Sequence, residues 1–218
     1  ATGVARSIND AEASGKIGLE YTYSDDLLLY ANFSRGFKGG GTSGSINFDP
    51  NRFQVYTPEI LNAYEAGFKW TALDGTVRFN SAIYYYDWED FQAATAVDIE
   101  GIRIIVLANA GDAEILGLES ELNWSVTEQF TLHLGFNWMD AEIVSGDFDG
   151  DTPAHTPDFM FNGIAKYDFA PMSSGVTPFA SVGFSYQDDI EFILTNHPGA
   201  TQDAYTLVDA RFGFTTED

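Results

Sequence analysis

The sequence predicts an all-β protein, in which about nine antiparallel strands run up and down and form a segment of a transmembrane β-barrel. Three observations support this fold class. Apolar and polar residues alternate along the extended stretches, as they do when successive side chains point to opposite faces of a sheet. Short and long connections alternate strictly along the chain. Most strands exceed the ~5–6 residues usual in globular proteins, and about ten tilted residues span the ~25 Å apolar band of a membrane barrel.

The period-2 pattern is clearest in FTLHLGFNWM, residues 130–139, where every second residue is large and apolar. It also holds in residues 17–24, 64–71 and 116–124, and it is less regular around Asn162. No stretch has a convincing helical period, and the seven prolines fall in loops or at strand starts, where a missing N–H is tolerated. In order, the predicted strands are residues 16–24, 27–38, 62–72, 76–92, 112–124, 129–143, 158–169, 177–187 and 204–214.

The connections between these strands are of two kinds. The short ones are residues 24–26, 73–75, 125–128 and 170–176, and the long ones are residues 39–61, 93–111, 144–157 and 188–203. In an up-and-down sheet this order places all short turns at one end and all long loops at the other. Outer-membrane barrels have this arrangement, with short periplasmic turns and longer extracellular loops, whereas a soluble β-sandwich has no reason to sort its loops.

The apolar parity of the strands is predicted to face lipid, and the parity rich in Gly, Ser, Thr, Asn and charged residues is predicted to face a wet lumen. Aromatic residues gather near both ends of the strands, as in the interfacial girdles of membrane barrels; the alternative is that they rim a soluble core. The predicted membrane-facing residues are Phe68, Trp70, Leu118, Leu122, Trp124, Phe130, Leu132, Leu134, Phe136 and Trp138.

Composition excludes several classes of function. The 33 acidic against 10 basic residues argue against nucleic-acid binding, which depends on neutralising phosphates. The chain has no cysteine, so it holds neither a disulfide nor a Cys-based metal site. The histidines are far apart and no nucleophile or phosphate-loop motif occurs, so we expect neither an enzyme nor a cofactor. No signal peptide opens the chain, which suggests a mature protein or a fragment.

Five phrases, in order, resemble the C-terminal half of the barrel of a TonB-dependent outer-membrane receptor, a siderophore-receptor-like protein. They cover most of residues 16–214, and together they are more specific than any one alone. The phrases are YANFSRGFKGGG (30–41), TPEILNAYEAGFKWTALDGTVRFNSAIYYYDWEDFQ (57–92), NAGDAEILGLESELNW (109–124), TPDFMFNGIAKYDF (156–169) and YTLVDARFGF (205–214).

The resemblance implies a 22-stranded barrel in the bacterial outer membrane, closed around an N-terminal plug domain. It implies energy-coupled uptake of a ferric siderophore or a similar scarce ligand. The implied partners are outer-membrane lipid and lipopolysaccharide, the plug domain, a TonB-type energy-coupling protein that engages the N-terminal part, and the small-molecule ligand. No plug precedes residue 16, and the chain stops at residues 215–218. We therefore expect residues 1–218 to be a partial β-barrel domain without the plug and the last strands.

Four residues are candidate ligand contacts. Tyr84, Tyr86 and Trp88 have lumen parity near the predicted 93–111 loop, and Lys38 has the same parity at the start of another long loop. The aromatic rings suit stacking on a siderophore or a sugar ring, and they suit packing against a plug equally well. Trp88 has a second interpretation, as part of the loop.

The acidic stretch SGDFDGD, residues 145–151, loosely resembles the start of a calcium loop. Asp147, Asp149 and Asp151 stand at alternate positions, but Asp158 occupies the place of the glutamate that this motif needs. We therefore expect a solvated acidic loop, with calcium bridging at the cell surface as the weaker hypothesis.

Two alternatives to an uptake receptor remain open from sequence. One is a passive porin or a surface-exposed binding barrel, which a plug domain and a coupling motif elsewhere in the protein would exclude. The other is a soluble all-β binding module, which would be folded and monomeric in buffer without detergent.

Overall fold

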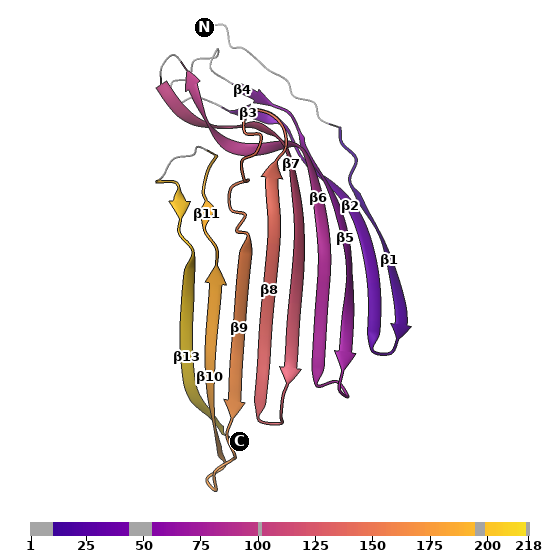
Figure 1. The fold of residues 1–218 in the computed structure, drawn as a ribbon, viewed down its shortest axis with the longest axis vertical. Helices are drawn as coiled ribbons and strands as arrows, with labels where there is room; N and C mark the ends of the chain where they lie inside the picture. The colour runs from indigo at the N-terminus through magenta and orange to yellow at the C-terminus, as the bar shows by residue number, and fades with distance from the viewer. Residues whose placement is uncertain (1–10, 44–53, 100–101, 195–198, 217–218) are drawn as a thin grey trace.

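The computed structural model describes residues 11–43, 54–99, 102–194 and 199–216. These residues form one nine-stranded antiparallel sheet (Figure 1). The order of the strands across the sheet is their order along the chain. Its strands are β1 (Gly15–Ser24), β2 (Leu27–Lys38), β5 (Glu59–Ala72), β6 (Val77–Ile99), β7 (Ile102–Ser125), β8 (Phe130–Ile143), β9 (Phe159–Asp168), β10 (Val176–Gln187) and β13 (Tyr205–Thr216). In this described part of the chain, no helix is long and apolar enough to cross a membrane.

Two small hairpins lie in the long connections. β3 (Gly41–Ser43) pairs with β4 (Gln54–Tyr56) between β2 and β5, and β11 (Ile190–Glu191) pairs with β12 (Thr201–Gln202) between β10 and β13. The all-β, up-and-down prediction is confirmed, and the predicted strands correspond to the nine strands of the sheet. The prediction of a loop at residues 93–111 is wrong, because β6 and β7 continue as a paired hairpin through most of it.

Cross-strand register gives the sheet one apolar and one polar face. Leu27, Trp70, Phe79, Leu122 and Leu134 are successive partners on five neighbouring strands, so their side chains lie in one row. The side-chain period of a strand is two, so the next row must face the opposite side. The register between strands and the alternation along each strand therefore fix which residues share a face.

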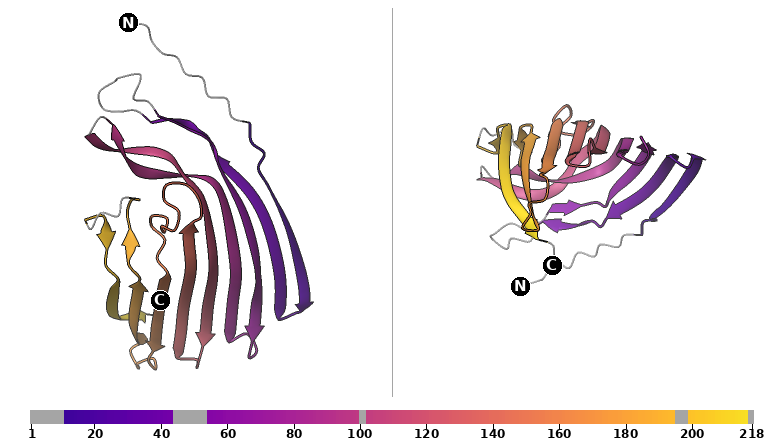
Figure 2. Two further views of the ribbon diagram at one scale, coloured as in Figure 1. Left: turned by 45° about the horizontal axis from the view of Figure 1, so that its top comes forward. Right: turned by 90° about the horizontal axis from the view of Figure 1, so that it is seen from below.

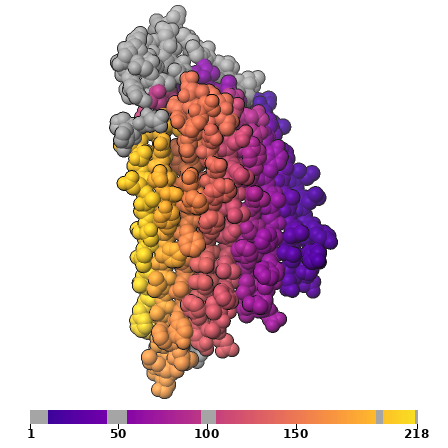
Figure 3. All heavy atoms as spheres, viewed as in Figure 1, coloured from indigo at the N-terminus to yellow at the C-terminus, as the bar shows by residue number. Residues whose placement is uncertain are grey.

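The neighbouring row shows the polar face. Lys69, Asn80, Glu121, Gly135 and Asn162 are successive partners from β5 to β9. The sheet is curved like a trough, as its end-on view shows (Figure 2). Figure 3 shows the strands side by side on one face, without another element over them along their length. The sheet is therefore a single curved wall with two different surfaces, as the alternation predicted.

Several aromatic rings lie across a glycine directly opposite on the neighbouring strand. Tyr84 is the partner of Gly117, and a Cβ atom added to that glycine would lie 2.1 Å from Tyr84 Cζ. Tyr30 lies against Gly67 in the same way, 2.8 Å from such a Cβ. Because the ring fills the space that the missing side chain leaves, each pair fits only one register of its two strands.

We predict that Gly117→Ala destabilises the barrel. The new methyl group would displace the buried Tyr84 ring, and overpacking of this kind costs about 1–3 kcal/mol. The thermal unfolding midpoint of the complete, detergent-extracted protein measures this loss. Gly36→Ala is the matched control, because a Cβ at Gly36 meets nothing within 4 Å. Equal midpoints for the two variants would contradict the prediction.

Candidate functional site

The long-loop end of the sheet carries a hairpin that leaves the wall. We call residues 91–99 of β6 and 102–110 of β7 the arm. In Figure 2 the arm bends away from the sheet and runs across the upper ends of β8, β9 and β10, toward the β11–β12 hairpin. An isolated bridge between Thr95 and Leu194 joins it to that side of the molecule. The arm thus connects the middle of the wall with its last strands.

The bend at the base of the arm comes from irregular pairing. Two residues of β6, Glu89 and Asp90, lie opposite Asp112 alone, which makes a β-bulge. Asp90 has a left-handed backbone (φ 53°), and its N–H donates to Asp112 Oδ1 at 3.0 Å. Gly111 has φ 122°, and a Cβ there would lie 1.9 Å from the Ser145 carbonyl oxygen. Aspartate and glycine are residues that tolerate these conformations, so the sequence encodes the bend locally.

A buried carboxylate lies against the bend. Glu59, the first residue of β5, is 7% exposed. Its Oε1 accepts a hydrogen bond from Trp88 Nε1, and its Oε2 accepts one from the backbone N–H of Gln92, both at 2.7 Å. Lys38 Nζ lies 3.9 Å from Oε2. Hydrogen bonds to a charged acceptor are among the stronger ones in proteins, and here they compensate for burying a carboxylate.

Two amide side chains extend this polar junction. Gln92 Nε2 donates to the carbonyl oxygens of Thr57 (3.0 Å) and Gly39 (3.2 Å). Asn109 Oδ1 accepts from the Thr57 N–H at 2.8 Å, while Asn109 Nδ2 donates to the Asp90 carbonyl oxygen at 2.7 Å. Both strands of the arm are therefore bonded at their base to the segment that leads into β5.

Small apolar residues pack beneath the arm. Ala93 and Ala110 of the arm form a buried cluster with Ala113, Ile143 and Leu194. Trp88, Phe91 and Phe148 pack against its edge, with the rings of Trp88 and Phe91 4.9 Å apart. The arm accordingly rests on residues from β7, from β8 and from the connection that follows β10.

The predicted ligand contacts lie near this junction, but they differ in exposure. Tyr84 is only 6% exposed and lies against Gly117, so little of its ring is accessible. Tyr86 stacks at 4.9 Å from Tyr84 and is half-buried, as is Trp88. Lys38 is more exposed. It forms an ion pair with Glu59, the same carboxylate that accepts a hydrogen bond from Trp88. Trp88 belongs to β6, so its interpretation as a loop residue is wrong.

Sequence reasoning missed Glu59, Gln92 and Asn109. Glu59 lies three residues before the predicted start of its strand. Gln92 is the last residue of a predicted strand, and Asn109 lies in the stretch interpreted as loop. Their side-chain hydrogen-bond partners are 19 to 54 residues away in the chain, which no local pattern reveals. The only sequence signal is an acidic residue directly after Pro58 in a phrase that resembles the receptor family.

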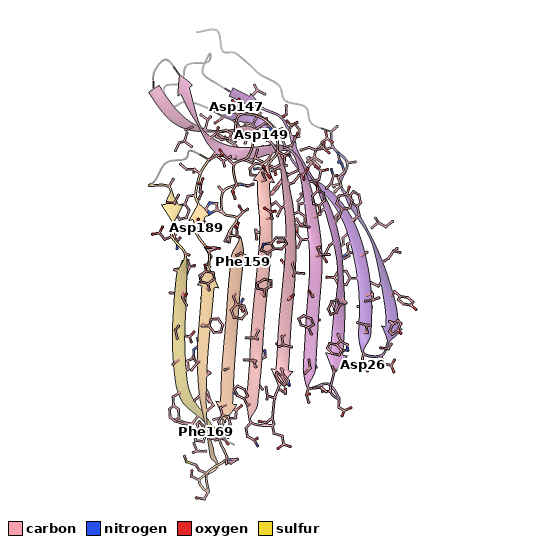
Figure 4. The ribbon with its side chains drawn as sticks, in the orientation of Figure 1. Asp26, Asp147, Asp149, Phe159, Phe169 and Asp189 are labelled. Carbon is pink, nitrogen blue, oxygen red and sulfur yellow. The ribbon has the colours of Figure 1, made fainter. Side chains whose placement is uncertain are left out.

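The acidic stretch in the β8–β9 connection lies at the same end of the molecule. Figure 4 shows Asp147 and Asp149 at the top, with Asp26 and Phe169 at the short-turn end. Main-chain bonds close this loop: Gly150 N–H donates to the Ile143 carbonyl oxygen at 2.8 Å. Among the described residues, no group of three acidic, histidine or cysteine side chains is arranged to hold a metal ion.

The ten predicted membrane-facing side chains share one face, and every one of them is partly or fully exposed. Trp70 and Trp124 lie near the short turns. Trp138 pairs with Phe159 toward the other end. Lipid contact of these residues remains a prediction, and the described residues place no protein layer over them.

Asp158 lies just outside β9 in an acidic neighbourhood. Burial raises the pKa of its carboxyl group above the ordinary value, and the carboxylates of Asp188, Asp140 and Asp189 raise it further. The folded state therefore favours the protonated form more than the unfolded chain does. Charged Asp158 lowers stability at pH values above its raised pKa, and this loss disappears as the pH falls through that pKa.

We predict that Asp158→Asn raises the unfolding midpoint of the complete protein at about pH 8, and that this gain disappears as the pH is lowered and the Asp158 carboxyl takes up its proton. The side chain is exposed, so water screens the charges and we expect a gain of only about 1–2 °C. Asp147→Asn, in the neighbouring loop, is the control. A gain that persists at the lower pH would contradict the electrostatic explanation.

The family model described as TonB dependent receptor-like, beta-barrel, matches residues 2–217. The chain belongs to the TonB-dependent receptor family. Members of this family are outer-membrane receptors of Gram-negative bacteria, and the strands of this wall are accordingly outer-membrane strands.

Two curated relatives agree with this assignment. The probable TonB-dependent siderophore receptor PiuA of Acinetobacter baumannii is 22% identical over 151 residues, which cover 67% of this chain and 19% of PiuA. The pesticin receptor of Yersinia pestis is 24% identical over 148 residues, which cover 66% of this chain and 20% of that receptor. The chain spans about a fifth of the length of these relatives.

Solved structures share the fold. The ferric yersiniabactin uptake receptor FyuA of Yersinia pestis superimposes with a TM-score of 0.74 at 19% identity, over 94% of this chain and 30% of FyuA. BauA, the ferric preacinetobactin receptor of Acinetobacter baumannii, gives 0.69 at 18% identity, with 94% and 30% covered. The described sheet thus has the shape of part of a TonB-dependent receptor barrel.

Proposed function

We propose that this chain forms part of the wall and of the extracellular mouth of a receptor for energy-coupled uptake of a ferric siderophore or a similar chelate. The observation that carries the proposal is the aromatic and cationic surface beside the arm, at the long-loop end of a TonB-dependent receptor wall. Related receptors are named for ferric yersiniabactin, ferric preacinetobactin and ferripyoverdine, which supports a chelate as the ligand class.

The half-buried and exposed groups at the mouth suit such a ligand. Tyr86 and Trp88 offer ring faces and edges for stacking on planar chelating groups. Lys38 supplies a positive charge for an anionic chelate, and its side chain is 55% exposed. Tyr84, being buried, packs beside Tyr86 on the same face of β6 rather than contacting the ligand.

The rest of the assembly follows from the same proposal. We assign residues 1–218 to the barrel domain, with a plug domain of the same protein in its lumen. A hollow of about 340 Å³ on the wall, lined among others by Tyr30, Lys69, Asn80 and Glu119, offers polar groups to that plug. Energy would reach the receptor through a TonB-type protein, and outer-membrane lipid and lipopolysaccharide would cover the apolar face.

Membership of this family argues against the soluble binding module and, since relatives are siderophore receptors, against a passive porin. The family consists of receptors and transporters rather than enzymes.

We predict that Tyr86→Ala and Lys38→Gln each weaken chelate binding about three- to tenfold, because a stacked ring or an exposed charge contributes ~0.5–1.5 kcal/mol. The probe is radioactive iron loaded onto the chelators that iron-starved cells of the source strain secrete. Binding and uptake are measured on cells that carry the complete receptor.

Tyr64→Ala is the matched control, since Tyr64 is 47% exposed on the opposite face of the wall. Cell-surface amounts of each variant are measured alongside. Normal uptake of the secreted chelates by cells that lack this receptor would contradict the proposed function.

A further inference from the structure

We infer that Glu59 is a positioning residue that fixes the arm across the extracellular end of the barrel. The inference concerns the arm itself; its consequence for ligand retention rests on the proposed function.

The two oxygen atoms of Glu59 act on opposite sides of the bend. Trp88, which donates to Oε1, precedes the bulge at Asp90 and still belongs to the wall. Gln92, whose backbone N–H donates to Oε2, follows the bulge and belongs to the arm. One carboxylate therefore joins the last regular residue of the wall to the first residues of the arm, and it does so from a third strand, β5.

The direction of the arm is thus set outside its own hairpin. A bulge alone bends a strand but leaves the bend angle free to vary with local twist. Here Gln92 and Asn109, one on each strand of the arm, also bond to Thr57, two residues before Glu59. Residues 57–59 hold both strands from the same side, so the arm cannot swing without breaking several of these bonds.

The far part of the arm is held differently. Thr95 and Leu194 are both 2% exposed and form a parallel bridge, and Leu194 packs in the cluster with Ala93 and Ala110. These contacts are a backbone bridge and apolar packing, and neither involves a charged group. Charged hydrogen bonds at the base and small-residue packing farther out thus fix the arm at two points.

Loss of the Glu59 hydrogen bonds at the base should therefore free the arm without unfolding the wall. The regular β6–β7 ladder from Val77 to Trp88 does not involve Glu59. Glu59→Gln keeps the size of the side chain but turns one acceptor into a donor that faces another donor. Trp88→Phe removes the indole N–H on the wall side and keeps an aromatic ring.

The position of the arm can be measured by a cross-link. The chain has no cysteine, so Thr95→Cys and Leu194→Cys introduce the only two thiols of these 218 residues, at a bridged pair close enough for a disulfide. The rate of disulfide formation after addition of a mild oxidant is followed in the complete receptor, in isolated outer membranes without ligand. We expect Glu59→Gln and Trp88→Phe each to slow it about fivefold or more.

Glu142→Gln is the matched control, because Glu142 is an exposed carboxylate at the extracellular end of β8 and should leave the rate unchanged. Heat-modifiable migration confirms that each variant is an assembled barrel. If Glu59→Gln does not assemble, Trp88→Phe carries the test. Unchanged cross-linking in the assembled variants would overturn the assignment of Glu59 as a positioning residue.

The link to uptake has a separate readout. Dissociation of the radioactive chelate is compared between the oxidised and the reduced double-cysteine receptor. We expect at least threefold slower release when the arm is locked. Equal release would overturn the retention role and leave the positioning of the arm intact, and because the cross-link needs no ligand, failure of the uptake proposal would show only in the binding assay.

Discussion

The structure depends on backbone hydrogen bonding in the wall of an outer-membrane barrel. Hydrocarbon offers no partner to an N–H or C=O group, so each strand inside the membrane must pair along its whole length with its neighbours. The continuous ladder from β1 to β13 meets this requirement for the strands between them. Long strands, tight turns at one end and strict alternation of side chains are consequences of keeping that ladder unbroken. The rings set opposite glycines hold its register.

Above the membrane the requirement is relaxed, and the chain changes character there. Water and side chains can satisfy backbone groups, so bulges, left-handed residues and buried polar side chains are found around Asp90, Gly111 and Glu59. β6 and β7 keep pairing with each other but leave their other neighbours, and the arm exists because of this. The same two strands are therefore part of the wall before the bulge at Asp90 and form the arm beyond it.

The sequence predicts the wall well because its rules are local. Parity alone places Phe136 and Trp138 on the face opposite Asn137. The lengths of the connections alone distinguish the short-turn end of the sheet from the long-loop end. The arm follows other rules. Apolar residues occur on both parities of the arm, such as Ala93 and Ala94 or Ile104 and Ile105. The arm packs on a buried cluster and is hydrogen-bonded at its base to residues 57–59. Such a stretch lacks period 2 and resembles a loop until its distant partners are known.

The dependence of the arm on residues 57–59 has a consequence for how these receptors can diversify. The arm and its support form a unit that is discontinuous in sequence: residues 57–59 at the start of β5, and a hairpin some thirty residues later. Exchange of the hairpin alone between two receptors would transfer the arm without the residues 57–59 that hold its base. Recombination that yields a working chimaera must therefore carry both pieces together, which places the permissible crossover points outside residues 57–110.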